Sequence, residues 1–169
     1  MLVRSVAAIL DRDLRTLRRE VEAYPEDAQL WQVVPGTPNA GGTLVLHLAG
    51  NLRHFIGNRL GGSGYVRDRA AEFSRRGVSR AELLDEIEAA RAELARAFAA
   101  LTDRNLPAEY PEVITERRVA TDEYLLHLLT HFGYHLGQLD THRRLVTGNP
   151  AGVGAVRPAE LSSARPASG

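Results

Sequence analysis

Apolar residues recur every three or four positions in four stretches of the chain, the spacing that places them on one face of an α-helix. These stretches predict helices over about residues 2–23, 43–60, 79–103 and 121–146. Connections of about 15–19 residues separate them, and they carry little of the alternating pattern that predicts strands. Four amphipathic helices with little strand signal predict an all-α protein with the architecture of a four-helix bundle.

Residues at the helix ends support three of these boundaries. Ser79 and Glu82 have the spacing of a capping box, which is typical of a helix start. Thr121 is expected to cap the last helix through its side chain. Gly148 is expected to end that helix, because a glycine followed closely by a proline, here Pro150, is typical of a C-terminus.

The segments outside the helices suggest how the chain is organised. The connection over residues 61–77 opens with glycines and could hold a helical turn, and residues 113–115 could form a short β-like stretch. Residues 148–169 are small, rich in Pro, Gly and Ser, and almost free of large apolar side chains. We therefore expect one bundle domain over residues 1–147 and a flexible C-terminal tail over residues 148–169.

Composition excludes several classes of function. The chain has 21 basic and 21 acidic residues, and a net charge of zero argues against an extended surface for nucleic acid or anionic membranes. Lysine is absent, which excludes a Schiff-base lysine, a pyridoxal-phosphate anchor and a P-loop lysine. Cysteine is also absent, which excludes a thiolate nucleophile and a cysteine-rich zinc site. The N-terminus resembles neither a signal peptide nor a membrane span, so we expect a cytoplasmic protein.

Histidines are concentrated in two of the predicted helices. Four of the six lie in the last helix, where they occupy an arc of about 80° beside the apolar face. The other two lie beside the apolar face of the helix over residues 43–60. If the two helices are neighbours, the two sets of imidazoles can meet. The histidines concerned are His127, His131, His135 and His142 in the last helix, and His47 and His54 in the earlier one.

Three of these imidazoles have the arrangement of a metal site. His131 and His135 are four residues apart, so they stack one helical turn above the other and can chelate one ion. His47 would complete a set of three nitrogen ligands, which leaves coordination positions open for water or substrate, as in catalytic sites. One turn further along the helices, Asn51 and Gln138 could contact the ligands, and the pattern leaves open the same role for Tyr134 (one position before His135).

Simpler interpretations remain open for the same residues. The histidines could be hydrogen-bonded core polarity or a pH-sensitive contact between two copies of the chain. For His54, His127 and His142 a supporting or surface position is favoured over direct metal ligation. Arg67 follows a glycine-rich segment and could line the mouth of a pocket or bind an acidic substrate, although an ion pair within its own loop is the favoured interpretation.

The histidine motifs also resemble a known family. "LVLHLAGNLRHFIG" and "HLLTHFGYHLGQLDTHRR" resemble the DinB-like (DinB/YfiT) superfamily of metalloenzymes, which has one histidine in the second helix and HxxxHxGQ in the fourth. The matching positions here are His47, His131, His135, Gly137 and Gln138. The resemblance covers about residues 1–147.

This resemblance implies several further properties. The bundle would have the order up-down-down-up, would bind a divalent ion, with nickel or zinc most usual, and would often be a homodimer. Some relatives are transferases or isomerases that use the low-molecular-weight thiols mycothiol or bacillithiol. A metal ion lowers the pKa of a bound thiol, and a chain without cysteine would take its sulfur from such a molecule.

We therefore expect a cytoplasmic, divalent-metal-binding protein that acts as a metal-dependent transferase or hydrolase on a small molecule. S-transfer from a low-molecular-weight thiol is one such reaction, although the branch of the superfamily that the chain resembles has no assigned reaction. Two alternatives remain open. The chain could be a metal-binding bundle without catalysis, or a metal-free dimeric bundle, acting in either case as a sensor or assembly module. No residue pattern in the chain identifies the substrate.

Overall fold

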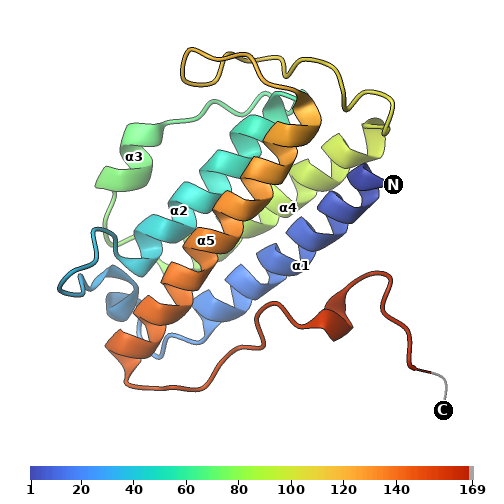
Figure 1. Ribbon diagram of the computed structural model, residues 1–169. Coiled ribbons are helices and arrows are strands. Elements are labelled where there is room, and N and C mark those ends of the chain that lie inside the picture. The colour runs from blue at the N-terminus through green and yellow to red at the C-terminus, as the bar shows by residue number, and fades with distance from the viewer. Residues whose placement is uncertain (168–169) are drawn as a thin grey trace.

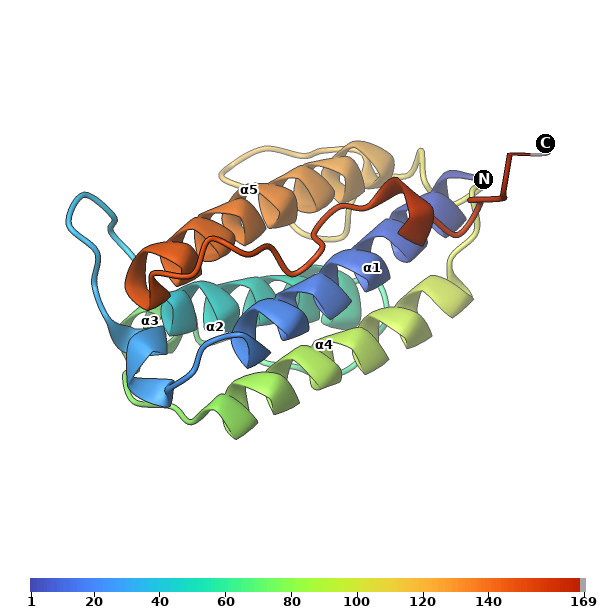
Figure 2. The ribbon, with the colours of Figure 1, turned by 90° about the horizontal axis from the view of Figure 1, so that it is seen from below.

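Four long helices form a bundle in the computed structural model, which describes residues 1–167 (Figure 1). They are α1 (Leu2–Glu22), α2 (Gly41–Leu52), α4 (Arg80–Ala100) and α5 (Thr121–Thr147). Figures 1 and 2 show that α1 and α5 run in one direction and that α2 and α4 run in the other. The order is therefore up-down-down-up, and the all-α four-helix bundle expected from the sequence is confirmed.

The packing of the bundle makes α2 and α5 antiparallel neighbours. Helix α1 packs against α4 and α5, and α2 packs against the same two helices, so α1 and α2 lie diagonally opposite each other. Parallel neighbours such as α2 and α4 require a long connection between them, because the chain must return along the length of the bundle. The connection between α2 and α4 serves this purpose, whereas the connections from α1 to α2 and from α4 to α5 join antiparallel helices that lie diagonally opposite each other.

The core is built from the apolar stripes that the sequence pattern identified. Leu10 and Leu14 of α1, Leu48 of α2, Leu83 of α4 and Phe132 of α5 are each no more than 1% exposed. Burying each such side chain contributes about 1.5–3 kcal/mol to folding, so the stripes determine which faces meet. None of the helices in residues 1–167 is both long and apolar enough to cross a membrane.

Helix α2 differs from its expected form at its C-terminal end. A single α-helix was expected over about residues 43–60, but α2 begins at Gly41 and ends at Leu52, and a π-helix, η2 (Arg53–Asn58), follows. In η2 the N–H of Arg59 donates to the carbonyl of His54, five residues earlier, at 3.0 Å. The wider turn changes the direction of the side chains that follow.

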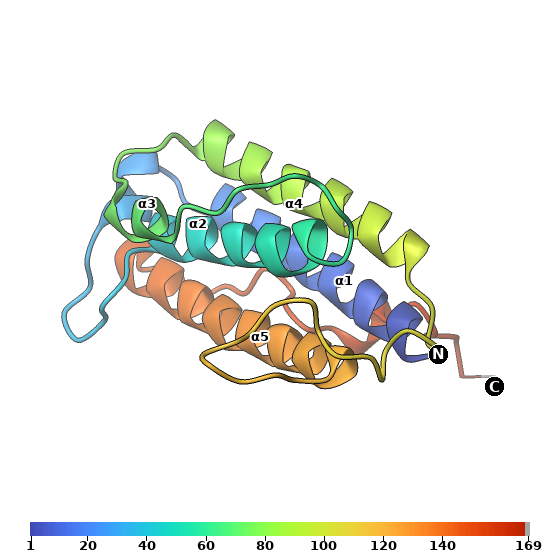
Figure 3. The same cartoon turned by 90° about the horizontal axis from the view of Figure 1, so that it is seen from above.

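Two of the connections between the long helices contain short structural elements, one beside α2 and one before α5. The connection after η2 contains a short helix, α3 (Arg69–Ser74), which confirms the expected helical turn and packs beside α2 (Figure 3). The connection over residues 101–120 forms only isolated bridges, between Glu109 and Ala120 and between Ile114 and Arg117. The β-like stretch expected at residues 113–115 is thus one arm of a tight turn, and residues 1–167 contain no strand.

The helix termini confirm two expectations and correct a third. The capping box of Ser79 and Glu82 is present, and Gly148 ends α5 with a φ of 65° in the left-handed region. Thr121 does not cap α5: the capping position is Ala120, and the Thr121 hydroxyl instead donates to the carbonyl of Ala108 at 2.9 Å. That hydrogen bond ties the preceding connection to the start of the helix. The sequence around Thr121 does not indicate that the Ala108 carbonyl competes for its hydroxyl.

The chain beyond α5 lies along α1 and α5 (Figure 2). Arg143 donates to the carbonyl of Ala151 at 2.9 Å, and Arg19 donates to the carbonyl of Val153 at 3.0 Å. A single turn of 3₁₀ helix, η3 (Pro158–Glu160), follows. The domain boundary at residue 147 and the flexibility of residues 148–169 stay predictions, and residues 168–169 lie outside the described part of the chain.

Candidate metal centre

Three histidine side chains from α2 and α5 converge between the two helices. His47 comes from α2, and His131 and His135 come from adjacent turns of α5. One ring nitrogen from each lies within 4.8 Å of the other two. The Nε2 atoms of His47 and His131 are 3.3 Å apart. Two nitrogens bound to one ion at about 2.0–2.1 Å with tetrahedral angles lie about 3.3–3.4 Å apart, so this spacing suits a shared metal ion.

The antiparallel packing of α2 and α5 is what brings the three rings together. The rings of His131 and His135, one turn apart on α5, have centroids 4.6 Å apart. The His47 ring lies 5.2 Å from the first and 5.1 Å from the second, edge-on to both. The set His47, His131 and His135, which the sequence analysis singled out, is therefore assembled in the fold, and we call it the triad below.

Hydrogen bonds on the outer side of the triad determine which ring nitrogens face inward. The Nδ1 of His47 donates to Oε2 of Glu72 at 3.0 Å, and the Nδ1 of His135 donates to Oε1 of Gln138 at 2.7 Å. Because each acceptor is an oxygen, each Nδ1 carries the hydrogen, and each Nε2 keeps a lone pair. The Nδ1 of His131 is buried and has no hydrogen-bond partner within residues 1–167. Converging lone pairs favour a cation, so the donor set fits a divalent metal ion.

Glu72 is the residue of the candidate site that sequence reasoning missed. It lies on α3, is 5% exposed, and is held by Arg67, whose Nε and Nη2 donate to its two carboxylate oxygens at 2.6 and 2.8 Å. Gly50 of α2 makes room for it, because a Cβ at that position would collide with Oε1 of Glu72. No regular spacing relates Glu72 to His47 along the chain, so only the packing of α3 on α2 reveals the contact.

The electrostatics of the site keep the imidazoles of His131 and His135 neutral and the carboxylate of Glu72 charged. Burial, together with the nearby His135 and His47, lowers the pKa of His131 to about 4. Burial also lowers the pKa of His135, more than its hydrogen bond with Gln138 raises it. Burial alone would raise the pKa of Glu72, but hydrogen bonds from Arg67 and His47 outweigh it, and the pKa is lowered. Neutral imidazoles and an ionised carboxylate are the protonation states that metal binding requires.

The other residues proposed to support the triad occupy different positions. Gln138 contacts His135 as described, and Arg67 reaches the site only through Glu72 and a 3.4 Å approach of Nη2 to Nδ1 of His47. Tyr134 is 66% exposed, and its ring packs edge-on against that of His135 with centroids 5.1 Å apart. Asn51 is buried, and its Oδ1 has no hydrogen-bond partner in the described part of the chain.

Two of the remaining histidines lie near the start of α5. His54 is bonded through Nε2 to Glu112 at 3.0 Å, so the connection over residues 101–120 holds it. His127 is exposed and stacks on Tyr124, with an interplanar angle of 14°. Its ring centroid lies 6.2 Å from that of His131, but it is not part of the converging set.

His142 is a buried structural residue. It is 1% exposed, its Nε2 donates to the carbonyl of Gln32 at 2.9 Å, and its Nδ1 accepts from the hydroxyl of Tyr24 at 2.8 Å. Both ring nitrogens are therefore used, and burial lowers the pKa of the imidazole. It lies neither at the surface nor in contact with the triad, because α1 and the segment after it cover this part of α5.

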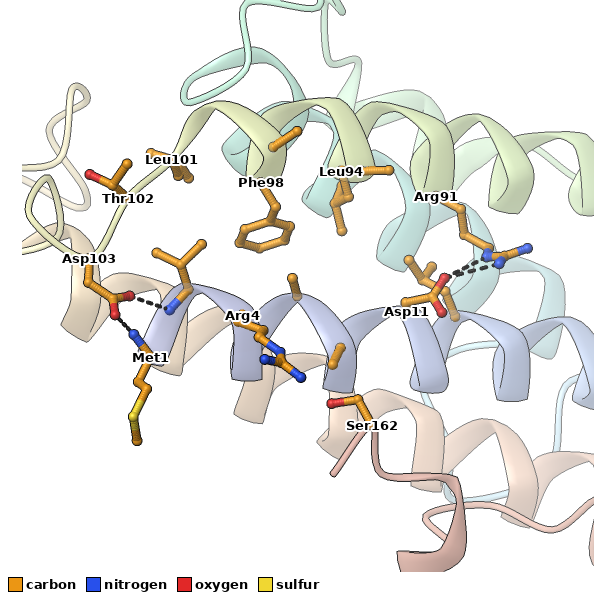
Figure 4. A pocket seen from close by; sticks show the side chains of 16 residues that line it. Met1, Arg4, Asp11, Arg91, Leu94, Phe98, Leu101, Thr102, Asp103 and Ser162 are labelled. Atoms are coloured by element: carbon orange, nitrogen blue, oxygen red, sulfur yellow. Dashed lines mark hydrogen bonds and ion pairs between the residues drawn. The ribbon is translucent and has the colours of Figure 1, made fainter. Parts of the chain in front are cut away.

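Two cavities differ in their relation to the triad. One of about 350 Å³ lies between α5 and residues 36–39, and its lining includes Gln138, which contacts His135 of the triad. The other, of about 660 Å³, lies between α1 and α4 and has no histidine in its lining (Figure 4). There Phe98 and Leu94 of α4 face α1, and Asp103 pairs with the amino group of Met1. Ser162 of the C-terminal segment lies at its edge. The larger cavity is therefore separate from the candidate metal centre.

Comparison with known proteins supplies one further finding. A family model described as Mycothiol-S-transferase matches residues 5–148. No curated protein and no solved structure matches the chain. The matched range includes the whole triad, Glu72 and Gln138, and it ends at the glycine that terminates α5.

Proposed function

Because the chain belongs to the mycothiol-S-transferase family, within the DinB-like superfamily, we propose that it is a metal-dependent enzyme that transfers a low-molecular-weight thiol to a small electrophilic molecule. His47, His131 and His135 would hold the divalent ion, with nickel or zinc as the proposed metal. The observation that carries the proposal is the convergence of one nitrogen from each imidazole within 4.8 Å. Three protein ligands leave positions free for a sulfur or oxygen atom, as catalytic metal sites require.

The residues of the chain have defined tasks in this reaction. Glu72 and Gln138 hold the hydrogens on Nδ1 of His47 and His135, so that each Nε2 remains a ligand throughout. The bound ion supplies Lewis acidity, which lowers the pKa of a thiol from about 8.5 and favours the thiolate at neutral pH. The lowered pKa values of His131 and His135 keep these two imidazoles neutral and able to bind a cation.

The composition of the chain agrees with an external source of sulfur. The sequence contains no cysteine and no lysine, so neither a protein thiolate nor a lysine amine can be the nucleophile. A small thiol that enters the site would supply the reacting group. The proposal therefore takes a thiol and an electrophile as the partners of the protein, and it takes a cytoplasmic homodimer as its working form, following the DinB-like relatives.

Metal analysis of protein purified without a histidine tag tests the proposal. We expect close to one equivalent of nickel or zinc per chain, and we expect His131→Ala to lose it, because two imidazoles hold an ion weakly. His127→Ala is the matched control, since this histidine lies on the same helix but outside the triad, and it should keep its metal. Wild-type protein without a divalent ion after reconstitution, or His131→Ala protein with a full complement, would refute the metal site.

Enzymatic activity requires a separate measurement. Metal-loaded protein should conjugate mycothiol to a fluorogenic electrophile, and His131→Ala should reduce the rate to that of the uncatalysed reaction. If the wild-type protein holds metal but does not accelerate the conjugation of any thiol, the bundle binds metal without transferase activity.

A further inference from the structure

The larger cavity, between α1 and α4, has a size and a lining that suit a small molecule. Its volume of about 660 Å³ lies within the range of about 300–1,000 Å³ that is common for such sites. The buried apolar side chains of Leu14, Leu94 and Phe98 form its floor, and the Phe98 ring lies between the two helices (Figure 4). The triad lies between α2 and α5, so this cavity is independent of the candidate metal centre.

Small side chains on both helices leave this space open. Two alanines of each helix line the cavity: Ala7, Ala8, Ala95 and Ala99. Alanine has no side chain beyond its Cβ, so facing alanines leave a space that larger side chains would fill in a close-packed interface. Ala95 and Ala99 are exposed, which leaves the cavity open to solvent on the α4 side. A molecule can therefore enter without displacing a core side chain.

Polar contacts between the two helices bound the cavity at both ends. At one end, Oδ1 of Asp103 accepts a hydrogen bond of 2.9 Å from the backbone N–H of Val3. At the other end, Nη2 of Arg91 lies 3.0 Å from Oδ1 of Asp11 (Figure 4). Asp103 and Asp11 are the acidic side chains among the described residues that line the cavity. Because each already has a partner in the protein, neither is free to attract a cation.

Arg4 is a basic side chain that lines the cavity without a partner. Its guanidinium forms no ion pair or hydrogen bond within residues 1–167, and Figure 4 shows such contacts for Arg91 but none for Arg4. The helix supplies no partner, because positions 7 and 8, one turn further along α1, are alanines and not acidic residues. Ser162 of the segment after α5 lies on the same side of α1 and adds a hydroxyl group. An anionic group would therefore find free donors here.

We propose that the cavity between α1 and α4 binds a small amphipathic acid, a molecule with an alkyl or aromatic body and one carboxylate. The body would leave water to pack against Leu14, Leu94 and Phe98. The carboxylate would pair with the guanidinium of Arg4, whose N–H donors match the two oxygens of a carboxylate. A cation would find no unpaired acidic side chain in the lining, and an uncharged molecule would leave Arg4 without a partner. This inference goes beyond the proposed function and does not depend on it.

Two tryptophan substitutions on α4 form a matched test of where the molecule binds. Ala95→Trp places a large side chain in the cavity, whereas Ala92→Trp places the same side chain three residues earlier, at a position that does not line it. Both alanines are exposed and both lie within α4, so neither variant requires the core to repack. Calorimetry on the full chain, with octanoate as the probe, measures binding. We expect Ala95→Trp to weaken it by at least about tenfold and Ala92→Trp to change it by no more than about twofold.

The charge preference is measured with three probes that share one alkyl body. Octanoate should bind the wild-type protein at least about fivefold more tightly than octan-1-ol or octylammonium, since a single partly solvated ion pair favours binding by about that factor. Arg4→Gln should reduce the affinity for octanoate to that for octan-1-ol and leave the affinity for octan-1-ol unchanged. Arg96→Gln is the control, because Arg96 is also exposed but does not line the cavity. It should bind all three probes as the wild type does.

Several results would overturn the proposal. They are equal affinities of the two tryptophan variants for octanoate, octylammonium binding as tightly as octanoate, and an Arg4→Gln variant that keeps the wild-type affinity for octanoate. Light scattering adds another: a wild-type dimer that Ala95→Trp dissociates would show that this face joins two copies of the chain. None of these results would change the metal content expected of His131→Ala, so this proposal and the proposed function can fail separately.

Discussion

The Nδ1 of His47, on α2, donates a hydrogen bond of 3.0 Å to the Oε2 of Glu72, on α3. This contact joins the triad to a buried carboxylate whose charge is maintained by two hydrogen bonds from Arg67. A carboxylate behind an imidazole ligand orients the ring and increases its basicity, and so strengthens its bond to a metal ion. Glu72 thus extends the candidate metal centre beyond α2 and α5.

Replacing Glu72 by glutamine should weaken metal binding without removing a ligand. Loss of the negative charge lowers the basicity of the His47 imidazole, and we expect the affinity for zinc or nickel to fall by about 10–100-fold. Competition with a chromophoric chelator measures this affinity. Glu88→Gln is the control, because Glu88 pairs with Arg18 and Arg91 between α1 and α4, whereas the triad lies between α2 and α5. Equal affinities in the two variants would show that Glu72 has no role at the centre.

Arg143 and Glu20 form a buried ion pair between α5 and α1, with 1% and 0% of their side chains exposed. Removing one partner leaves an uncompensated charge in the core, so Arg143→Met should lower the free energy of unfolding by about 3–5 kcal/mol. Urea denaturation measures the change. The neighbouring Arg144 pairs with Asp140 but is 41% exposed, so Arg144→Met should cost only about 0–1 kcal/mol. Similar losses in both variants would contradict a special role for the buried pair.

The stability of the metal-free protein should depend on the protonation of His142. Burial lowers the pKa of this imidazole, so the folded chain binds the proton more weakly than the unfolded chain, whose histidines titrate near 6.5. The free energy of unfolding should therefore decrease as the pH falls from 7 toward 5. Denaturation at several pH values should show a smaller decrease for His142→Gln than for the wild type. The same slope in both proteins would contradict this origin of the pH dependence.

The segment after α5 should contribute to stability but not to metal binding. Its backbone carbonyls accept hydrogen bonds from Arg19, Arg143 and Arg144 at distances of 2.7–3.0 Å. A chain that ends at residue 149 loses these bonds, each worth about 0.5–1.5 kcal/mol, and should unfold at a lower temperature than the full chain. Its metal content should be unchanged, because the triad lies elsewhere. An unchanged unfolding temperature would support a segment that is detached in solution.

Much of the fold could be predicted from the chain itself because the long helices bury continuous apolar stripes. The spacing of Leu10 and Leu14, and the capping box of Ser79 and Glu82, are local patterns that need no knowledge of neighbouring elements. The π-helix after Leu52 and the uncapped start of α5 were not predictable in the same way. Both depend on packing against segments that are distant in the sequence.

The candidate site, like the fold, was predictable from the sequence only in part. The four-residue spacing of His131 and His135 is a helix property, so the sequence by itself determined that these two imidazoles share one face. Helix geometry suggested His47 as their partner, and the family resemblance supported it. Tertiary structure decided that α2 and α5 are antiparallel neighbours, that Glu72 reaches His47 from α3, and that His142 is buried away from the triad. Periodicity places a side chain on a face, but only the packing of separate helices determines which atoms that face will meet.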